Sequence, residues 1–469
     1  MKTIFNIIVA GTLLSLSACK KDFLDLKPYN QISLDVAITS ESDMQAAVNG
    51  TYAQLRDNDL FGRTLPLIGD LLADNAYIST QNSNRYIPEF TYSYINTHAN
   101  AQNTWNDAYN AILRANNIIN ANLPSTTNTG QLKGEALTLR AFMYFTLVNL
   151  YAKPYFTDAN AVGVPLVLEY DPNLKPSRAK LSEVYTQIEK DLNDAFGLMT
   201  VTNKNSSFIS KYVAKAILAK VLLFKGDYNG AKTAALEVVN NGGYTLTAAA
   251  NLVNYWRNPS PVTSKVETIF EITSDNIDNG GSNSLAYFYD QAGYGDALCT
   301  EELYNQYSAT DARRGLLING VRAGQNVRIV NKYSNTTNNS EKDDVKIIRY
   351  ADVLLILAEA YARTSDDANA LIRLNQVTTQ RDPSFTGYTF TGAALINTII
   401  TERRKELAFE GHRYFDLLRL GQSVQRLNLN NNYPSNAPLT LPTDNYRRIW
   451  PIPQSELDAN PNVVQNSGY

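Results

Sequence analysis

The sequence predicts a mainly α-helical protein, in which tetratricopeptide-like helical hairpins form one side and a large, irregular, loop-rich segment forms the other. Three observations predict this class: a long helix that is apolar on almost every face, two Ala-rich helical hairpins, and a stretch from about residue 245 to residue 340 that is rich in Gly, Asn, Ser and Tyr and has little sustained period.

The long helix is expected at residues 135–151, EALTLRAFMYFTLVNLY. Apolar side chains occupy nearly all of its faces, so it should be buried on most sides and lie centrally. Pro154 follows it and is typical of a helix stop. A second helical pattern at 105–121 precedes it, begins at Trp105, and is expected to be its packing partner.

Two further segments are typical of helical hairpins. Residues 212–244 contain two Ala-rich helical patterns joined by a Gly226-Asp227 turn, and residues 350–377 repeat this plan with a turn at 364–367. Small alanine side chains let two helices approach closely. Such hairpins cannot bury their faces alone, so we expect them to stack into a curved array.

The stretch between the hairpins is predicted to be loop-rich structure. It contains the runs NGGSNS and NTTNNS, and a segment of this length without elements of its own is usually functional or a packed irregular subdomain. Its tyrosines favour function, while Trp256 is expected in the core. No low-complexity linker divides the chain, so we predict one domain over residues 19–469.

The N-terminal segment, residues 1–18, is predicted to be a signal peptide. Lys2 is positively charged, an apolar stretch runs to Leu16, and small residues follow. The apolar stretch is shorter than the roughly 20 residues that a membrane-spanning helix needs. The sequence LSAC at 16–19 looks like the lipobox of bacterial lipoproteins, which predicts Cys19 as a lipid attachment site. The alternative is an ordinary signal peptide followed by an unrelated cysteine.

The composition is that of an ordinary soluble globular protein, with 44% hydrophobic and 19% charged residues. Removal of the signal peptide loses the positive charge of Lys2 and moves the formal net charge from -3 to -4. With no basic run, this balance argues against nucleic acid or an anionic membrane face as the main partner. Cys299 is the one other cysteine, so a protein acylated at Cys19 has no intramolecular disulfide.

The sequence lacks the common signatures of catalytic and metal sites. His98 and His412 are the only histidines, and there is no CxxC, HExxH, GxSxG, phosphate loop or GxGxxG after a strand. We therefore expect no dedicated metalloenzyme, no metal site and no cofactor. A glycosidase needs only two carboxylates, however, and 45 acidic residues leave that reading open.

The most regular motif is TERRKELAFEGHRYFDLLR at 401–419. One interpretation makes Glu406, Glu410 and His412 a metal or acid–base cluster. The interpretation that we favour is a partly buried ion-pair network that fixes a turn of the chain, in which Gly411 adopts a positive φ.

Four stretches, taken in order, resemble the SusD/RagB family of Bacteroidota. They are CKKDFLDLKP from Cys19, GEALTLRAFMYFTLVNLY from Gly134, RYADVLLILAEAYAR from Arg349, and TERRKELAFEGHRYFDLLRLG from Thr401, the last followed by the ending PIPQSELDANPNVVQNSGY. Together they span nearly the whole mature chain.

The resemblance implies a tetratricopeptide-like scaffold with an irregular ligand-binding side. It also implies a lipoprotein of the outer membrane that faces the cell exterior, binds oligosaccharides or, in some members, peptides, and delivers them to a SusC-like TonB-dependent transporter. The resemblance further implies a protein that binds its ligand without chemical change and is not an enzyme. A glycoside hydrolase and a tetratricopeptide scaffold for protein partners are the alternatives.

Sugar binding requires flat aromatic faces together with carboxylates, amides or guanidinium groups for hydroxyls. Two regions, 69–90 and 285–296, carry such residues and are expected to meet on one exposed surface, although each could equally be a solvated loop with packed tyrosines. The candidate ligand-binding residues are Asp74, Asn75, Arg85, Tyr86, Tyr287, Tyr289 and Tyr294.

Overall fold

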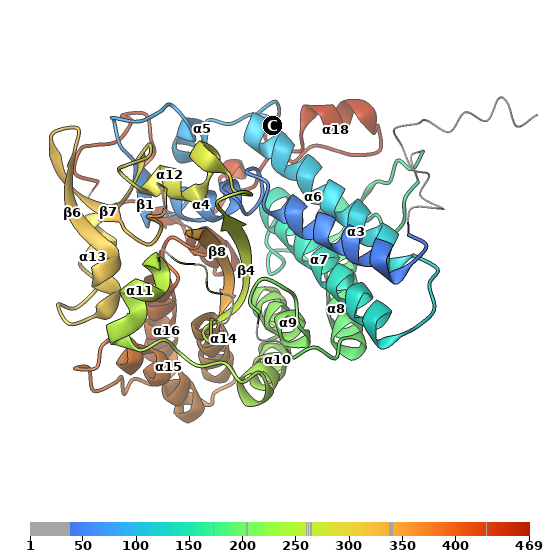
Figure 1. The fold of residues 1–469 in the computed structure, drawn as a ribbon. Coiled ribbons are helices and arrows are strands. Elements are labelled where there is room, and N and C mark those ends of the chain that lie inside the picture. The colour runs from blue at the N-terminus through green and yellow to red at the C-terminus, as the bar shows by residue number, and fades with distance from the viewer. Residues whose placement is uncertain are drawn as a thin grey trace, which may run out of the picture.

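The computed structural model describes residues 38–469 except 172, 203–204, 259, 261, 263–264, 337–340 and 428. The predicted signal peptide, 1–18, and Cys19 therefore lie outside the described residues. Long helices form one part of the molecule, and short strands, short helices and loops form the other (Figure 1). In the described part of the chain, no helix is both long and apolar enough to cross a membrane.

The helices confirm the predicted mainly α-helical class. The long helices are α3 (Glu41–Leu55), α6 (Ala99–Ile119), α7 (Thr127–Tyr151), α8 (Leu181–Leu198), α9 (Lys211–Lys225), α10 (Tyr228–Asn241), α14 (Tyr350–Arg363), α15 (Asp367–Arg381) and α16 (Gly392–Glu406). The shorter α-helices are α4 (Thr64–Leu71), α5 (Ile87–Thr91), α11 (Leu252–Arg257), α12 (Leu285–Tyr289), α13 (Glu301–Tyr304), α17 (Arg413–Arg419) and α18 (Gln454–Ala459). Short 3-10 helices are η2 (Ala249–Asn251), η3 (Gly281–Asn283), η4 (Ala312–Leu316) and η5 (Tyr446–Arg448).

Helix α7 is the predicted central helix, and it begins earlier than the apolar pattern does. Thr126 caps it by accepting the Thr129 N–H at 3.1 Å, while the Thr129 hydroxyl accepts the Thr126 N–H at 2.9 Å. This capping box satisfies backbone donors that the first helical turn leaves free. Because α6 packs on one side and α8 on another, most side chains of α7 are buried, as predicted.

Both predicted hairpins are present. Helices α9 and α10 form the first, and Gly226 joins them in the left-handed region at φ 85°, where a side chain would be strained. Helices α14 and α15 form the second, with the Asp366 carboxylate accepting the Asn369 N–H at 3.2 Å. Helix α10 also packs against α14, so the two hairpins stack on each other.

Several strands occur that the sequence patterns did not predict. They are β1 (Ala76–Ile78), β2 (Val162–Pro165), β3 (Arg178–Lys180), β4 (Thr268–Asp275), β5 (Ala297–Cys299), β6 (Leu317–Arg322), β7 (Gln325–Val330), β8 (Glu341–Arg349), β9 (Val424–Gln425) and β10 (Thr440–Leu441). The largest sheet has the order β1-β5-β7-β6, and β4 pairs with β8. Most of these strands are too short to show a period of two in the sequence.

The stretch at 245–340 is thus a packed irregular region rather than loop alone. It supplies α11, β4, α12, β5, α13, β6 and β7 as well as the 3-10 helices η2 to η4. Trp256 in α11 is 4% exposed and Trp105 in α6 is 1% exposed, which confirms both as core residues. Strand β1 comes from the 69–90 region and pairs antiparallel with β5, which directly follows the 285–296 region, so this pairing brings the two candidate regions together.

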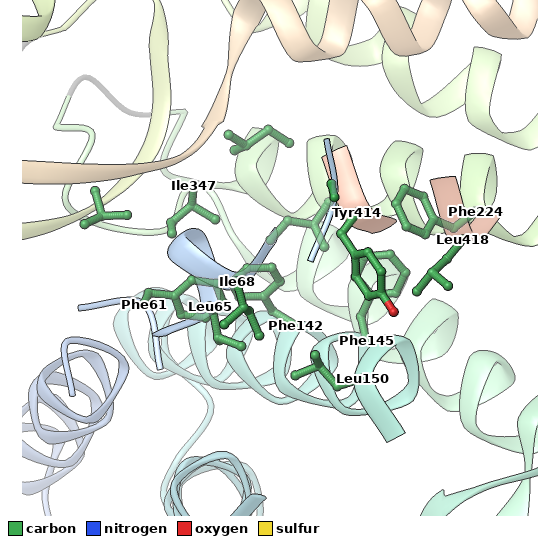
Figure 2. Packing of buried hydrophobic residues seen from close by; sticks show 14 of the residues in the cluster. Phe61, Leu65, Ile68, Phe142, Phe145, Leu150, Phe224, Ile347, Tyr414 and Leu418 are labelled. Carbon is green, nitrogen blue, oxygen red and sulfur yellow. The ribbon is translucent and has the colours of Figure 1, made fainter. Parts of the chain in front are cut away.

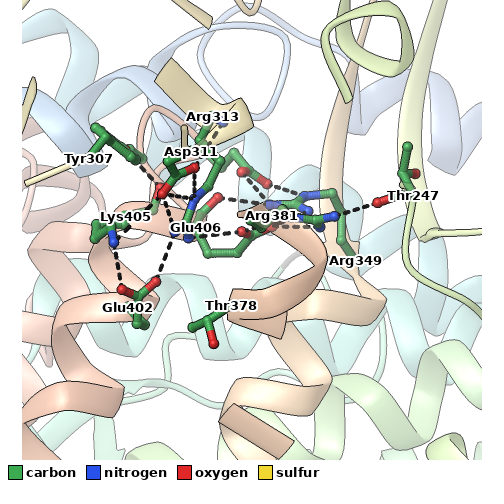
Figure 3. Close-up of polar contacts among 12 residues, drawn as sticks. Thr247, Tyr307, Asp311, Arg313, Arg349, Thr378, Arg381, Glu402, Lys405 and Glu406 are labelled. Atoms are coloured by element: carbon green, nitrogen blue, oxygen red, sulfur yellow. Dashed lines mark hydrogen bonds and ion pairs between the residues drawn. The ribbon is translucent and has the colours of Figure 1, made fainter. Parts of the chain in front are cut away.

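A buried ion-pair network joins these parts (Figure 3). Glu406, the last residue of α16, contacts the guanidinium groups of Arg313, Arg349 and Arg381 at 3.2, 2.9 and 2.9 Å. Burial alone would raise the pKa of Glu406, but the charges of these arginines outweigh it and hold the pKa well below its ordinary value. The predicted interpretation of the 401–419 motif as an ion-pair network is confirmed, and the network is fully buried.

The turn after α16 fits tightly against α4. Gly411 has φ 80°, as predicted for a positive-φ glycine. A Cβ added at Gly69 in α4 would lie 2.1 Å from the Gly411 carbonyl oxygen, so only glycine fits there. The Asp70 carboxylate accepts the N–H groups of Phe409 and Gly411 at 3.0 and 2.9 Å.

The apolar core runs between α7 and the elements that face it (Figure 2). Phe145 of α7 is 5% exposed and meets the ring of Phe224 in α9 edge-on, with centroids 5.2 Å apart. Phe142 stacks on Phe61 at 4.9 Å. These contacts tie the hairpin scaffold to α4 and its preceding loop.

Replacing Phe145 with Ala should lower the free energy of unfolding by about 3 to 5 kcal/mol, because it removes a buried ring and leaves a cavity. Denaturant titration followed by circular dichroism measures this. Ile277→Ala is the control, since Ile277 is 96% exposed and its loss should change stability by about 0.5 kcal/mol or less. Equal stability of Phe145→Ala and the wild type would contradict the central position of α7.

Candidate ligand-binding surface

The two candidate regions lie side by side, as expected from the sequence. The Ser83 N–H donates to both carboxylate oxygens of Asp296, at 3.1 and 3.2 Å, and the Ser79 N–H donates to the Asp296 carbonyl at 3.0 Å. Asp296 is 1% exposed, so the contact lies beneath the surface. The loop after β1 is therefore held against the loop that leads into β5.

A third segment, the β6–β7 hairpin, fixes both loops through Arg322. The Arg322 guanidinium donates to the carbonyls of Gln81 and Tyr294, at 2.9 and 2.6 Å, and lies 3.7 Å from Asp296. Sequence analysis missed Arg322 and Asp296. No local pattern marks them, because their partners are far away in the chain and the hairpin itself was not predicted.

Three of the seven candidate residues reach solvent on this surface. Arg85 is exposed, and Tyr287 and Tyr294 are half-buried. The Arg85 guanidinium lies 4.2 Å from the centroid of the Tyr294 ring, and the Tyr287 ring meets the Tyr294 ring edge-on at 5.9 Å. We call these three residues the Arg85–Tyr294 surface.

The Arg85–Tyr294 surface is polar as well as aromatic. A hydrogen bond with Ser282, followed by the hydrogen bond and charge of Arg85, lowers the pKa of Tyr294 from its ordinary value. The phenol oxygen of Tyr294 is thus polarised by neighbouring hydrogen-bond donors. A cation, hydroxyl groups and aromatic edges converge here.

The expectation that all seven candidate residues are exposed is wrong for Tyr289. It is 0% exposed, its ring stacks on Tyr333 at 5.7 Å, and Phe409 lies edge-on at 5.8 Å. Helix α12 ends at Tyr289, and two positions along a helix point to nearly opposite sides, so Tyr287 faces outward while Tyr289 faces the core. Tyr289 is a packing residue in this structure.

Asp74, Asn75 and Tyr86 are also buried, for different physical reasons. The Asp74 carboxylate forms a paired contact with the Arg413 guanidinium at 2.7 and 2.8 Å, and Asn75 accepts from Arg404 at 2.8 Å. Tyr86 is 4% exposed, and its hydroxyl accepts from Arg63 at 2.6 Å. All three side chains are therefore engaged in internal contacts and are not exposed together with Arg85 and Tyr294.

Glu406 and Glu410 of the 401–419 motif are engaged by arginines and do not form the alternative metal or acid–base cluster with His412. The oxygens of Glu406 and Glu410 accept from arginines, and the pKa of His412 is lowered to about 3 by burial and by the charge of Lys220. Among the described residues, the carboxylates of Asp57, Asp59 and Asp107 lie within 4.8 Å of one another, but Asp57 is exposed and no other feature there indicates a cation.

Comparison with known proteins agrees with this architecture. A family described as "SusD family" matches residues 300–469, and one described as "Starch-binding associating with outer membrane" matches residues 22–223. SusD-like protein P2 of Formosa agariphila is 27% identical, with 99% of each chain covered.

Solved structures of Bacteroides proteins have the same fold. A putative sugar binding protein from Bacteroides vulgatus aligns with a TM-score of 0.84 and 28% identity over 92% of this chain and 99% of that one. A SusD superfamily protein from Bacteroides thetaiotaomicron aligns with a TM-score of 0.83 and 26% identity over 91% of this chain and 100% of that one. With the two matched regions, the hairpin scaffold and the irregular side taken together, the chain belongs to the SusD/RagB family.

Proposed function

We propose that this protein is a surface-exposed lipoprotein that captures oligosaccharides and delivers them to a SusC-like TonB-dependent transporter in the outer membrane. The observation that carries the proposal is the Arg85–Tyr294 surface, where exposed polar and aromatic groups stand on loops held by Asp296 and Arg322. One family that matches is described as starch-binding, and one similar solved structure is that of a putative sugar binding protein.

The chemistry of this surface suits a sugar. The half-exposed rings of Tyr287 and Tyr294 offer apolar faces and edges to the C–H groups of a pyranose. The Arg85 guanidinium and the Tyr294 hydroxyl supply donors for sugar hydroxyls. Because the loops are already fixed, little conformational entropy is lost when a ligand binds.

Binding without chemical change fits the same geometry. Members of the SusD family are binding proteins. Beneath the surface, both oxygens of the Asp296 carboxylate accept hydrogen bonds from Ser83, so Asp296 serves to hold loops. A peptide-binding role within the same family is the alternative, and release of shorter products from a polysaccharide would instead indicate a glycoside hydrolase.

Arg85→Ala and Tyr294→Ala should each weaken oligosaccharide binding several-fold, because a stacked aromatic or a charged hydrogen bond contributes on the order of 1 kcal/mol or more. Isothermal titration calorimetry with a panel of starch-derived and other oligosaccharides, and with peptides as the comparison, measures this. Arg114→Ala and Tyr170→Ala, which remove exposed residues of the same types elsewhere, should bind as the wild type does.

Tyr289→Ala distinguishes a tyrosine that packs in the core from tyrosines that bind ligand. It should lower the free energy of unfolding most, since the ring is fully buried, whereas Tyr294→Ala at a half-buried position should lower it less and Arg85→Ala at an exposed position least. Unchanged binding in both surface variants, or selective peptide binding, would contradict the assignment of a sugar to this surface.

The proposed lipid anchor at Cys19 and the proposed transporter partner are tested with membrane fractions. Cys19→Ala should abolish labelling with a fatty-acid analogue and release the protein from the membrane fraction, because each buried acyl methylene contributes about 0.8 kcal/mol to anchoring. Affinity purification of the wild type from detergent-solubilised outer membranes should recover a large β-barrel transporter. An unlabelled wild type would contradict the lipoprotein proposal, and recovery of the protein alone would contradict the partnership.

A further inference from the structure

A second polar cavity lies away from the Arg85–Tyr294 surface, between α11 and the β4–β8 pair. Its volume is about 200 Å³, larger than the cavity of about 150 Å³ that holds a benzene molecule in another protein. Asn254 is exposed at its rim, so the cavity opens to solvent. The residues that matter to its chemistry are Tyr255, Trp256, Lys265, Asp343, Asp344 and Lys346.

Lys346 is a buried cation without a hydrogen-bond acceptor. Its side chain is 5% exposed, and its Nζ lies 4.5 and 5.0 Å from the ring centroids of Trp256 and Tyr255. Among the described residues, no hydrogen bond or ion pair joins the Lys346 ammonium to another side chain, although the backbone of Lys346 pairs with that of Glu271 in the β4–β8 ladder. Nearby Lys265 differs, since its ammonium contacts Glu271 at 3.0 Å and Asp344 at 2.5 Å. The ammonium faces a cavity that solvent can enter, so an oxygen atom of a ligand in that cavity can accept a hydrogen bond from Lys346 in place of water.

Asp343 determines the class of that ligand. Its carboxylate accepts from the backbone N–H and the side-chain amide of Asn335, at 2.7 and 3.0 Å, and lines the same cavity as Lys346. Burial raises the pKa of Asp343 to about 7, so its surroundings oppose additional negative charge. An anionic ligand would lie close to both Asp343 and Asp344, and their negative charge would repel it. A hydroxyl group, in contrast, accepts from an ammonium and donates to a carboxylate at once.

We propose that this cavity binds a neutral, hydroxyl-rich group of the size of a monosaccharide unit, with the Lys346 ammonium as donor and the Asp343 carboxyl as its second hydrogen-bond partner. The cavity shares no lining residue with the Arg85–Tyr294 surface. The proposals for the two sites can therefore be tested independently.

Intrinsic fluorescence tests the proposal on the folded protein. Trp256 is one of three tryptophans and lies at this cavity, so titration with glucose, galactose and xylose should give a saturable change in emission with at least one of them. Trp256→Phe should remove that change. Lys346→Met should weaken binding by about tenfold or more, because it removes a charged hydrogen bond and keeps the side-chain length. The exposed Lys153→Met is the matched control and should bind as the wild type does.

Three further variants keep the test decisive. Asp343→Asn should also weaken the sugar-dependent change in tryptophan emission. This variant replaces Lys346→Met in the test if circular dichroism shows that Lys346→Met does not fold. Arg85→Ala and Tyr294→Ala should retain the response. The proposal is overturned if no sugar gives a saturable change in the wild type, if folded variants at both 343 and 346 bind as the wild type does, or if Tyr294→Ala abolishes the response that Lys346→Met retains.

Discussion

The structure depends on one buried carboxylate, Glu406, and on the three arginines that surround it. Arg349 immediately precedes α14, Arg381 ends α15, and Arg313 lies in η4 on the irregular side. Arg349 and Arg381 also share Glu267, next to the start of β4, at 2.5 and 2.6 Å. The second hairpin, helix α16 and the irregular region therefore meet at a single set of charges.

This arrangement acts as a constraint on geometry more than as a source of stability. Replacing a buried ion pair by apolar residues is often neutral, but removing one partner costs about 3 to 5 kcal/mol, because a charge is then stranded in the interior. A shift of the irregular region relative to the hairpins would leave several buried charges without partners at once. Arg313 lies in η4, directly before β6, which carries Arg322, and Arg349 ends β8, which carries Lys346, so elements that contribute to both sites are joined to this network.

The sequence predicted the helical part well because its signals are local. Alanine-rich patterns and the Gly226 turn define the first hairpin, and the continuous apolar face defines α7. The candidate surface was predicted only in part. Loops from both regions do meet, but burial of Asp74 depends on Arg413, and that of Tyr289 depends on the short helix α12, neither of which a local pattern reveals. Arg322 and Lys346 were missed for the same reason, since their roles come from contacts across the chain.

The central claim is that the loops joined by Asp296 and Arg322 present an oligosaccharide-binding surface. The most direct test is a crystal structure of the protein soaked with the oligosaccharide that binds most tightly in solution. The account predicts ligand density within hydrogen-bonding distance of Arg85 and in contact with the Tyr294 ring. Density on the outer face of the helical hairpins, with the Arg85–Tyr294 surface occupied by solvent, would contradict it.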